Sequence, residues 1–148
     1  MRFITAATAL AFGATVLAAP APQVDDPASE DVSITEFFVH VAGANGTTSG
    51  TPDAVSFKLS GENATDLACS ASTGVPSEVI SCGDSPYSFA VLQGNTTSNF
   101  ALRIYHALGV AVGFYGEGVV PTYCHAGGLN SLACSQVQTP LVIHIDSE

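Results

Sequence analysis

The sequence predicts an all-β fold, a compact antiparallel β-barrel with a sandwich-like character, and three observations support this prediction. Short apolar segments recur along the chain between clusters of Gly, Pro, Asn and Asp. These segments are rich in β-branched and aromatic residues, which favour strands. No segment shows a convincing amphipathic helical period.

The N-terminus predicts secretion. Residues 1–18 have the three parts of a secretory signal peptide: the basic start Met1-Arg2, an apolar run, and small residues before Ala19-Pro20. We expect cleavage after Ala18 and an extracellular location. Residues 19–31 are rich in Pro, Asp and Ala and are predicted to be a flexible acidic segment in which Glu30 and Asp31 are solvated. The single folded domain is then expected at residues 32–148.

The first half of this domain predicts four strands. The segment 33–41 is β-branched and aromatic and ends at Gly43-Ala44-Asn45-Gly46. In 54–59 apolar residues alternate with polar ones, and the strand ends at Gly61. Shorter strands are expected at 66–71 and 78–82.

The second half predicts three or four more strands. The segment 87–92 ends at Gly94, and 100–108 places alternate residues, His106 among them, on one face. A turn near Gly109 is expected to return the chain along 110–115, and a last strand is expected at 141–145. Because many of these strands are apolar on both faces, a closed barrel or two packed sheets would cover them.

Composition and charge restrict the function. The chain has 148 residues, 47% of them hydrophobic and 11% charged, which suits one domain with a core of its own. Thirteen acidic residues against three basic ones give a formal net charge of −10. Such a surface repels phosphate backbones and anionic lipid head groups, so nucleic-acid binding and polybasic membrane binding are excluded.

Catalytic and metal-binding motifs are absent from the sequence. There is no Gly-x-Ser-x-Gly elbow and no His-Glu-x-x-His pair. The four scattered histidines are interpreted as hydrogen-bonded core or surface residues, although convergence of His40 and His144 on a metal stays open. We therefore predict no enzymatic activity, no cofactor and no metal site.

The sequence leaves two hydrolase alternatives to this prediction. A glycosidase would need a carboxylate pair from Glu36, Glu117 and Asp146. A secreted ribonuclease would need a carboxylate, a histidine and a cationic clamp on the phosphate, for which Arg103 is nearly the only candidate.

The four cysteines predict a disulfide framework. In a secreted chain Cys69, Cys82, Cys124 and Cys134 are most simply two disulfides. Their spacing allows three connectivities, and local pairing, Cys69 with Cys82 and Cys124 with Cys134, demands least of the fold. The segment 124–128, Cys-His-Ala-Gly-Gly, is interpreted as a loop shaped by its disulfide rather than as an active site.

At these cysteines the chain resembles a family of fungal secreted proteins typified by the major allergen of Alternaria moulds. The clearest match is Val-Pro-Thr-Tyr-Cys-His-Ala-Gly-Gly at 120–128, followed by Leu-Ala-Cys-Ser-Gln at 132–136. Ile-Thr-Glu-Phe-Phe at 34–38 and the segments around Cys69 and Cys82 are also similar.

This resemblance implies an antiparallel β-barrel with the two local disulfides and no catalysis. It also implies an effector, elicitor or allergen, connected with virulence, that binds an extracellular or defence protein of a plant host. Dimeric relatives use an extra N-terminal cysteine, and the mature chain has none before Cys69, so a covalent dimer is not expected. The segment 71–78 diverges from the family pattern.

The negative charge predicts a basic partner, whose binding weakens with added salt. The alternative from another class is an extracellular carrier of a small apolar ligand, held inside the barrel or between two protomers.

Three Asn-x-Thr sequons predict a glycoprotein. Asn45, Asn63 and Asn95 each lie beside turn-forming residues, where a surface glycan can be accommodated. We expect at least one of them to carry a glycan in the natively secreted protein. Endoglycosidase treatment should then increase the mobility of the band on a denaturing gel, and an unshifted band would contradict the expectation.

Overall fold

The computed structural model describes residues 28–43, 50–73, 75–76, 78–93, 99–108 and 114–147. The predicted signal peptide, residues 19–27 of the predicted acidic segment, Asn45 and Asn95 lie outside these residues.

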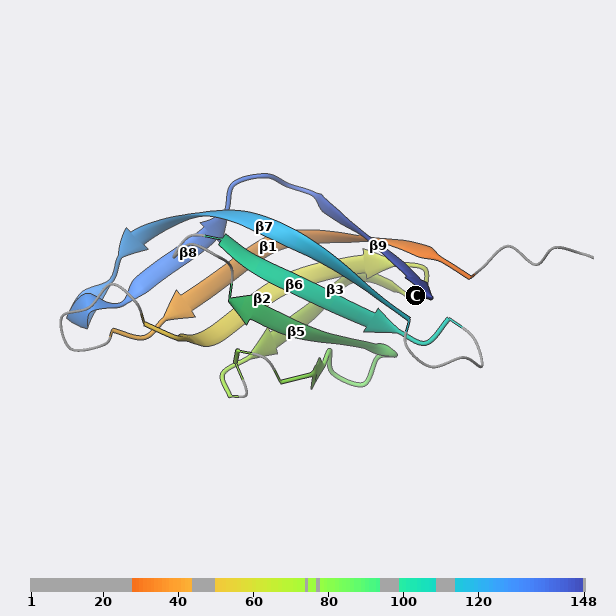
Figure 1. Cartoon of the computed structure of the whole chain (residues 1–148), viewed down its shortest axis with the longest axis horizontal. Helices are drawn as coiled ribbons and strands as arrows, with labels where there is room; N and C mark the ends of the chain where they lie inside the picture. Colours follow the sequence, from red (N-terminus) through yellow and green to blue (C-terminus); the bar gives the residue numbers. More distant parts are fainter. Residues whose placement is uncertain are drawn as a thin grey trace, which may run out of the picture.

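Nine antiparallel strands make up the described part of the chain (Figure 1). In chain order they are β1 (Glu30–Val41), β2 (Pro52–Gly61), β3 (Ala64–Ala71), β4 (Ile80–Ser81), β5 (Tyr87–Gln93), β6 (Asn99–His106), β7 (Phe114–Ala126), β8 (Leu132–Gln136) and β9 (Leu141–Ser147). A single 3-10 turn, η1 (Gly128–Asn130), joins β7 to β8. Among the described residues no helix has the length and apolar character needed to cross a membrane.

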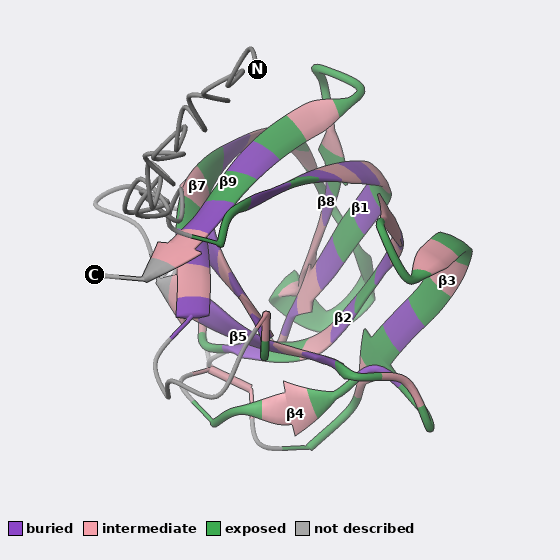
Figure 2. Ribbon diagram, turned by 90° about the vertical axis from the view of Figure 1, so that its right-hand side faces the viewer, coloured by how far each residue is buried: buried purple, intermediate pink, exposed green. Residues whose placement is uncertain are grey.

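One strongly curved sheet contains all nine strands. Its order is β3-β2-β1-β8-β7-β6-β5-β4, and β9 pairs with both β1 and β7. Seen along the length of the molecule, the strands surround a common interior, with β3 and β4 on neighbouring sides (Figure 2). The strand path ends at β3 and β4, so the fold is sandwich-like rather than a barrel closed by hydrogen bonds. The predicted fold class is confirmed.

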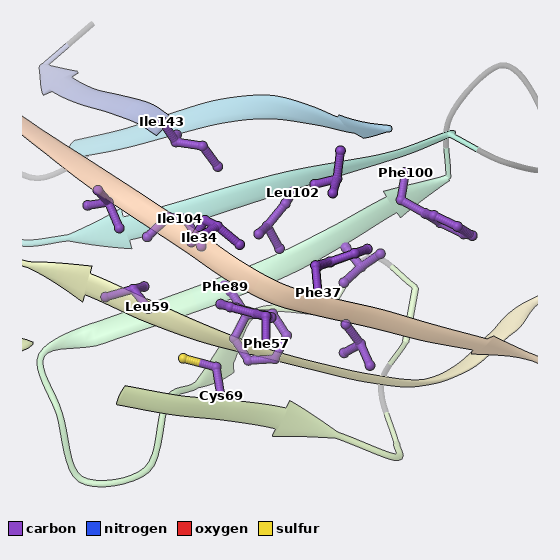
Figure 3. Packing of buried hydrophobic residues seen from close by; sticks show 14 of the residues in the cluster. Ile34, Phe37, Phe57, Leu59, Cys69, Phe89, Phe100, Leu102, Ile104 and Ile143 are labelled. Atoms are coloured by element: carbon purple, nitrogen blue, oxygen red, sulfur yellow. The ribbon is translucent and has the colours of Figure 1, made fainter. Parts of the chain in front are cut away.

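Apolar side chains from facing strands fill the interior (Figure 3). Three phenylalanines form its centre: Phe57 packs edge-on against Phe89, with ring centroids 4.9 Å apart, and Phe37 lies 6.1 Å from Phe57. The strand pattern explains this filling, since alternate residues of each strand point inward. In β6, for example, Phe100, Leu102 and Ile104 are buried, as the alternation predicted. An apolar ligand carried in the interior would have to displace these side chains.

The predicted boundaries were wrong at β7 and β8. The segment 124–128 was expected to be a loop and β8 was not predicted, but β7 continues to Ala126 and pairs with β8, with Cys124 opposite Cys134. The many glycines of β7 concealed this long strand. A Cβ at Gly116 would lie 2.0 Å from the His144 carbonyl oxygen, so glycine is the residue that lets β9 pack against β7.

The predicted start of the domain was also wrong. β1 begins at Glu30, inside the segment expected to be flexible, and Glu30 is buried rather than solvated. The physical reason is a set of hydrogen bonds to Glu30 from three other parts of the chain, which local composition does not reveal.

Both disulfides are local. Cys69 of β3 is bonded to Cys82, directly after β4, and Cys124 of β7 to Cys134 of β8. The first bond joins the two ends of the strand path, since the Cα atoms of Cys69 and Cys82 are 4.7 Å apart. The second joins strands that are already paired. The first therefore holds together edges that no described ladder joins.

Replacing Phe57 by alanine tests the core. Because Phe57 is buried between Phe37 and Phe89, Phe57→Ala should lower the free energy of unfolding by about 3–5 kcal/mol. Phe38→Ala is the matched control: Phe38 belongs to the same sheet but is 37% exposed, and its loss should cost less than about 1 kcal/mol. Urea denaturation of both variants measures this difference, and equal losses would contradict the packing described.

Candidate binding surface

The outer face of β1, β8 and β7 presents an ordered row of side chains. Phe38 lies opposite Ser135, and Ser135 lies opposite Tyr123, so the two aromatic residues are in register on either side of a serine. The next row repeats the arrangement: His40, Ala133 and His125 are opposite one another. We call these two rows the aromatic furrow, with walls on β1 and β7 and a floor of small side chains on β8.

Hollows flank this furrow at Phe38. One, of about 670 Å³, lies between the outer face of β1–β3 and the segment that leads to β4, and Phe38, Ser70, Glu78 and Val79 are among its lining residues. A smaller one, of about 250 Å³, is lined by Phe38, Ser135 and neighbouring polar side chains. Phe38 therefore forms a ridge between two depressions of an otherwise open sheet surface.

The larger hollow is lined by one carboxylate, that of Glu78, which belongs to a group of exposed acidic residues before, on and after β3 and β4 that we call the acidic edge. Its four exposed carboxylates, carried by the β2–β3 turn, by β3 and by the segments flanking β4, belong to Glu62, Asp66, Glu78 and Asp84. Within the described residues none of them forms an ion pair, because the two basic side chains are bonded elsewhere: Lys58 to Glu36 at 2.7 Å and Arg103 to Glu117 at 2.8 Å. The acidic edge thus keeps its negative charge.

Arg103 is not placed to clamp a phosphate. Its Nε and Nη2 both donate to Oε2 of Glu117, and its guanidinium lies 4.8 Å above the ring of Tyr115. The hydrogen bond from Arg103 to Glu117 raises the pKa of the guanidinium. The arginine proposed for a ribonuclease is therefore committed to a carboxylate of its own sheet.

The three carboxylates that are candidates for a glycosidase line two different hollows. Glu117 and Asp146 line a hollow of about 370 Å³ over β6, β7 and β9, whereas Glu36 lines the small hollow beside Phe38. Oε2 of Glu117 accepts two hydrogen bonds from Arg103. This carboxylate is therefore bonded within its own sheet rather than free to meet a glycosidic bond.

The histidines do not converge on a metal. His40 is paired with Asp53, and His144 with Asp31, on different parts of the surface. Across the described ranges no group of three or more His, Cys, Asp and Glu side chains could hold a metal ion.

A buried polar cluster, absent from the sequence prediction, lies at one end of the interior. Oε1 of Glu30 accepts hydrogen bonds from the Tyr87 hydroxyl and from the backbone N–H of Glu62, both at 2.6 Å. Its Oε2 accepts one from Nδ1 of His106, also at 2.6 Å. The neighbouring Gly61 makes room for these contacts, because a Cβ there would lie 2.3 Å from Oε1. Four separate segments therefore meet on one carboxylate.

The cluster shifts the pKa of two of its members. Burial would raise the pKa of Glu30, but hydrogen bonds from Tyr87, His106 and Glu62 outweigh burial and lower it. Burial, together with the hydrogen bond to the Glu30 carboxylate, raises the pKa of Tyr87 to about 12. The carboxylate is thus held in its charged form within the protein.

A carboxylate next to a histidine is also what acid–base catalysis requires. Here the side chains of Glu30 and His106 are 1% and 4% exposed, and the ring of Tyr87 stacks on His106 with centroids 4.2 Å apart. A substrate cannot reach either group without opening this end of the interior. The geometry is that of a structural cluster.

Asn63 lies at the rim of this cluster. It is the described member of the three sequons, and it is exposed in the turn between β2 and β3. Its side-chain nitrogen is 3.3 Å from Nε2 of His106, and its backbone N–H donates to the Tyr87 hydroxyl. A glycan on Asn63 would therefore be attached at an atom that faces a buried residue.

Comparison with known proteins identifies the family of this chain. The family model described as Alternaria alternata allergen 1 matches residues 34–134. The chain belongs to this family. It is 46% identical to the effector protein PevD1 of Verticillium dahliae, over 99% of this chain and 95% of that protein. The crystal structure of Alternaria alternata allergen Alt a 1 is similar, with a TM-score of 0.49 and 21% identity over 86% of this chain and 94% of that one.

The family match confirms the resemblance seen in the sequence, and it makes this protein effector- and allergen-like. The matched range includes the acidic edge, all four cysteines and the aromatic furrow except Ser135. Glu30 lies outside it, although the relative PevD1 aligns with nearly the whole chain.

Replacing Glu30 tests the cluster. Glu30→Gln should lower the free energy of unfolding at neutral pH by about 1–3 kcal/mol, because one of the two buried oxygens that accept hydrogen bonds from Tyr87, His106 and Glu62 becomes an amide nitrogen, which cannot accept them. Folding lowers the pKa of the Glu30 carboxylate. Such a group stabilises the folded protein at pH values above its pKa in the unfolded chain, about 4.3. This stabilisation is lost as the pH falls through the lower pKa of the folded protein. The difference between wild type and variant should therefore shrink below about pH 4.3.

Asp31→Asn is the control for this experiment. Asp31 is the next residue of β1 and is also paired with a histidine, but that pair is solvent-exposed, so its loss should cost less than about 1 kcal/mol. Denaturant titrations of the three proteins between neutral and acid pH measure both effects. A Glu30→Gln effect that is constant over this range would contradict the role given to the carboxylate.

Proposed function

We propose that this member of the Alternaria allergen family is a secreted fungal effector or elicitor that acts by binding a basic extracellular protein of its host. The proposal assigns no catalytic step to it. The observation that carries the proposal is the acidic edge, whose exposed carboxylates form no ion pair with a described basic side chain, and of which Glu78 lines the 670 Å³ hollow.

Three lines of reasoning support a host protein as the ligand. The relative PevD1 is described as an effector protein, which is a protein that acts on another organism. A net charge of −10 attracts basic partners and repels nucleic acids and acidic membranes. A hollow with apolar and hydroxyl side chains and the carboxylate of Glu78 is suited to receive a lysine or arginine side chain together with its apolar neighbours.

A plant is the proposed host, because the resembling fungal proteins are plant-associated. In this setting the rigid, disulfide-linked sheet presents exposed loops and strand faces as its binding elements. Electrostatic steering would increase the rate of association and make it sensitive to salt.

Capture of host proteins tests the proposal. The mature protein, immobilised, should retain a basic protein from plant extracellular fluid at low salt and release it as the ionic strength rises, since exposed charges are screened. The triple variant Glu62→Gln, Glu78→Gln, Asp84→Asn should bind this protein at least about tenfold more weakly, through slower association.

The matched control is Asp146→Asn, which removes a carboxylate from the hollow over β6, β7 and β9. It should bind like the wild type in surface plasmon resonance. Capture that does not depend on the salt concentration would contradict a partner recognised by the acidic edge. An equal loss of binding in the triple variant and in the control would contradict it as well.

A further inference from the structure

We propose that the aromatic furrow is a second binding site and that its ligand is an uncharged, β-1,4-linked glycan. In this site the pyranose rings stack on Phe38 and Tyr123, and hydroxyl groups of the sugar bind to the polar side chains between and beside them. The site shares Phe38 with the 670 Å³ hollow, but it uses none of the carboxylates of the acidic edge and does not depend on the function proposed for them.

The spacing of the two aromatic residues is the first argument. Phe38 and Tyr123 are each opposite Ser135, so they are separated by two strand spacings, about 10 Å. In a β-1,4-linked chain every second sugar turns the same way, and the repeat of two sugars has a similar length. Two successive like-oriented rings can therefore meet Phe38 and Tyr123 at once.

The chemistry of the furrow is the second argument. A pyranose ring has an apolar C–H face, which packs on an aromatic ring, and a rim of hydroxyl groups, which need hydrogen-bond partners. Tyr123 is 68% exposed and offers both its ring and its hydroxyl. Ser135 and the imidazoles of His40 and His125 lie within the same two rows and can donate or accept.

The shape of the furrow is the third argument. The two β8 residues that lie between its aromatic sides are Ala133 and Ser135, so only small side chains of that strand separate the two rings. At the Ser135 end it continues into the 250 Å³ hollow. The disulfide of Cys124, next to Tyr123, ties the β7 wall to the floor strand, so the site is held rigid before a ligand arrives.

Charge complementarity distinguishes this ligand from the partner of the acidic edge. The carboxylates nearest the furrow already have partners within the protein, since Asp53 is bonded to His40 and Glu36 to Lys58. The two rows of the furrow contain no acidic, lysine or arginine side chain. A basic protein gains the most electrostatic attraction at the acidic edge, whereas an uncharged glycan at the furrow forgoes no such attraction.

Titration with defined sugars tests the proposal. Chitohexaose and cellohexaose, which differ in their 2-substituent, are added to the mature protein, and binding is followed by calorimetry and by NMR signals of the tyrosines. At least one hexasaccharide should bind, and its monosaccharide should bind at least about tenfold more weakly because it contacts one ring only. Failure of both hexasaccharides to bind would overturn the proposal.

Substitutions locate the site. Phe38→Ser and Tyr123→Ser should each weaken binding about tenfold, the value of one stacked ring. Val142→Ser is the matched control, because Val142 is an exposed apolar residue of β9, outside the furrow. The circular dichroism and melting temperature of each variant show whether it is folded.

The triple variant of the acidic edge separates the two sites. It should bind the glycan like the wild type, so loss of the host protein alone would leave the furrow proposal supported. Two results would show that the furrow is not a glycan site. One is that Val142→Ser weakens glycan binding as much as Tyr123→Ser does. The other is that the furrow variants no longer bind the host protein but still bind the glycan.

Discussion

The buried carboxylate of Glu30 is the interaction on which one end of the molecule depends. A charge in an apolar interior is costly unless every oxygen is bonded, and here a phenol, an imidazole and a backbone amide share that task. These donors come from β5, β6 and the β2–β3 turn, while the carboxylate itself begins β1. The same contact therefore sets where the folded domain starts and how four segments of the chain meet.

The sequence predicted the strands where side chains alternate, because alternation is a local consequence of one face being buried. This holds for β2 and β6, and the family resemblance added the pairing of the four cysteines. Prediction from the sequence failed where the deciding contact joins residues that are far apart in the chain. The glycines of β7 serve the approach of β9, and Glu30 finds its partners 32 to 76 residues away. The register that aligns Phe38 with Tyr123 is equally non-local, so neither residue was singled out.

Two surfaces of different character lie on one small scaffold. The acidic edge carries charge that the protein does not neutralise, and the aromatic furrow carries rings and hydroxyl groups among carboxylates that are already paired. The aromatic furrow is built on strands, whose positions are fixed by the ladder, whereas the acidic edge lies mostly on the turns and connections next to β3 and β4. Divergence at either surface can change a ligand without disturbing the core, since the exposed residues of a strand alternate with the buried ones.

The Cys69–Cys82 bond has a consequence for survival outside the cell. It encloses the whole segment from β3 to β4, part of which overhangs the larger hollow. A protease that cuts the chain anywhere within this segment produces two new ends but no separate fragment, because both sides stay covalently joined to the same sheet. The protein can therefore tolerate a nick in this connection and keep the strands on which its surfaces are displayed.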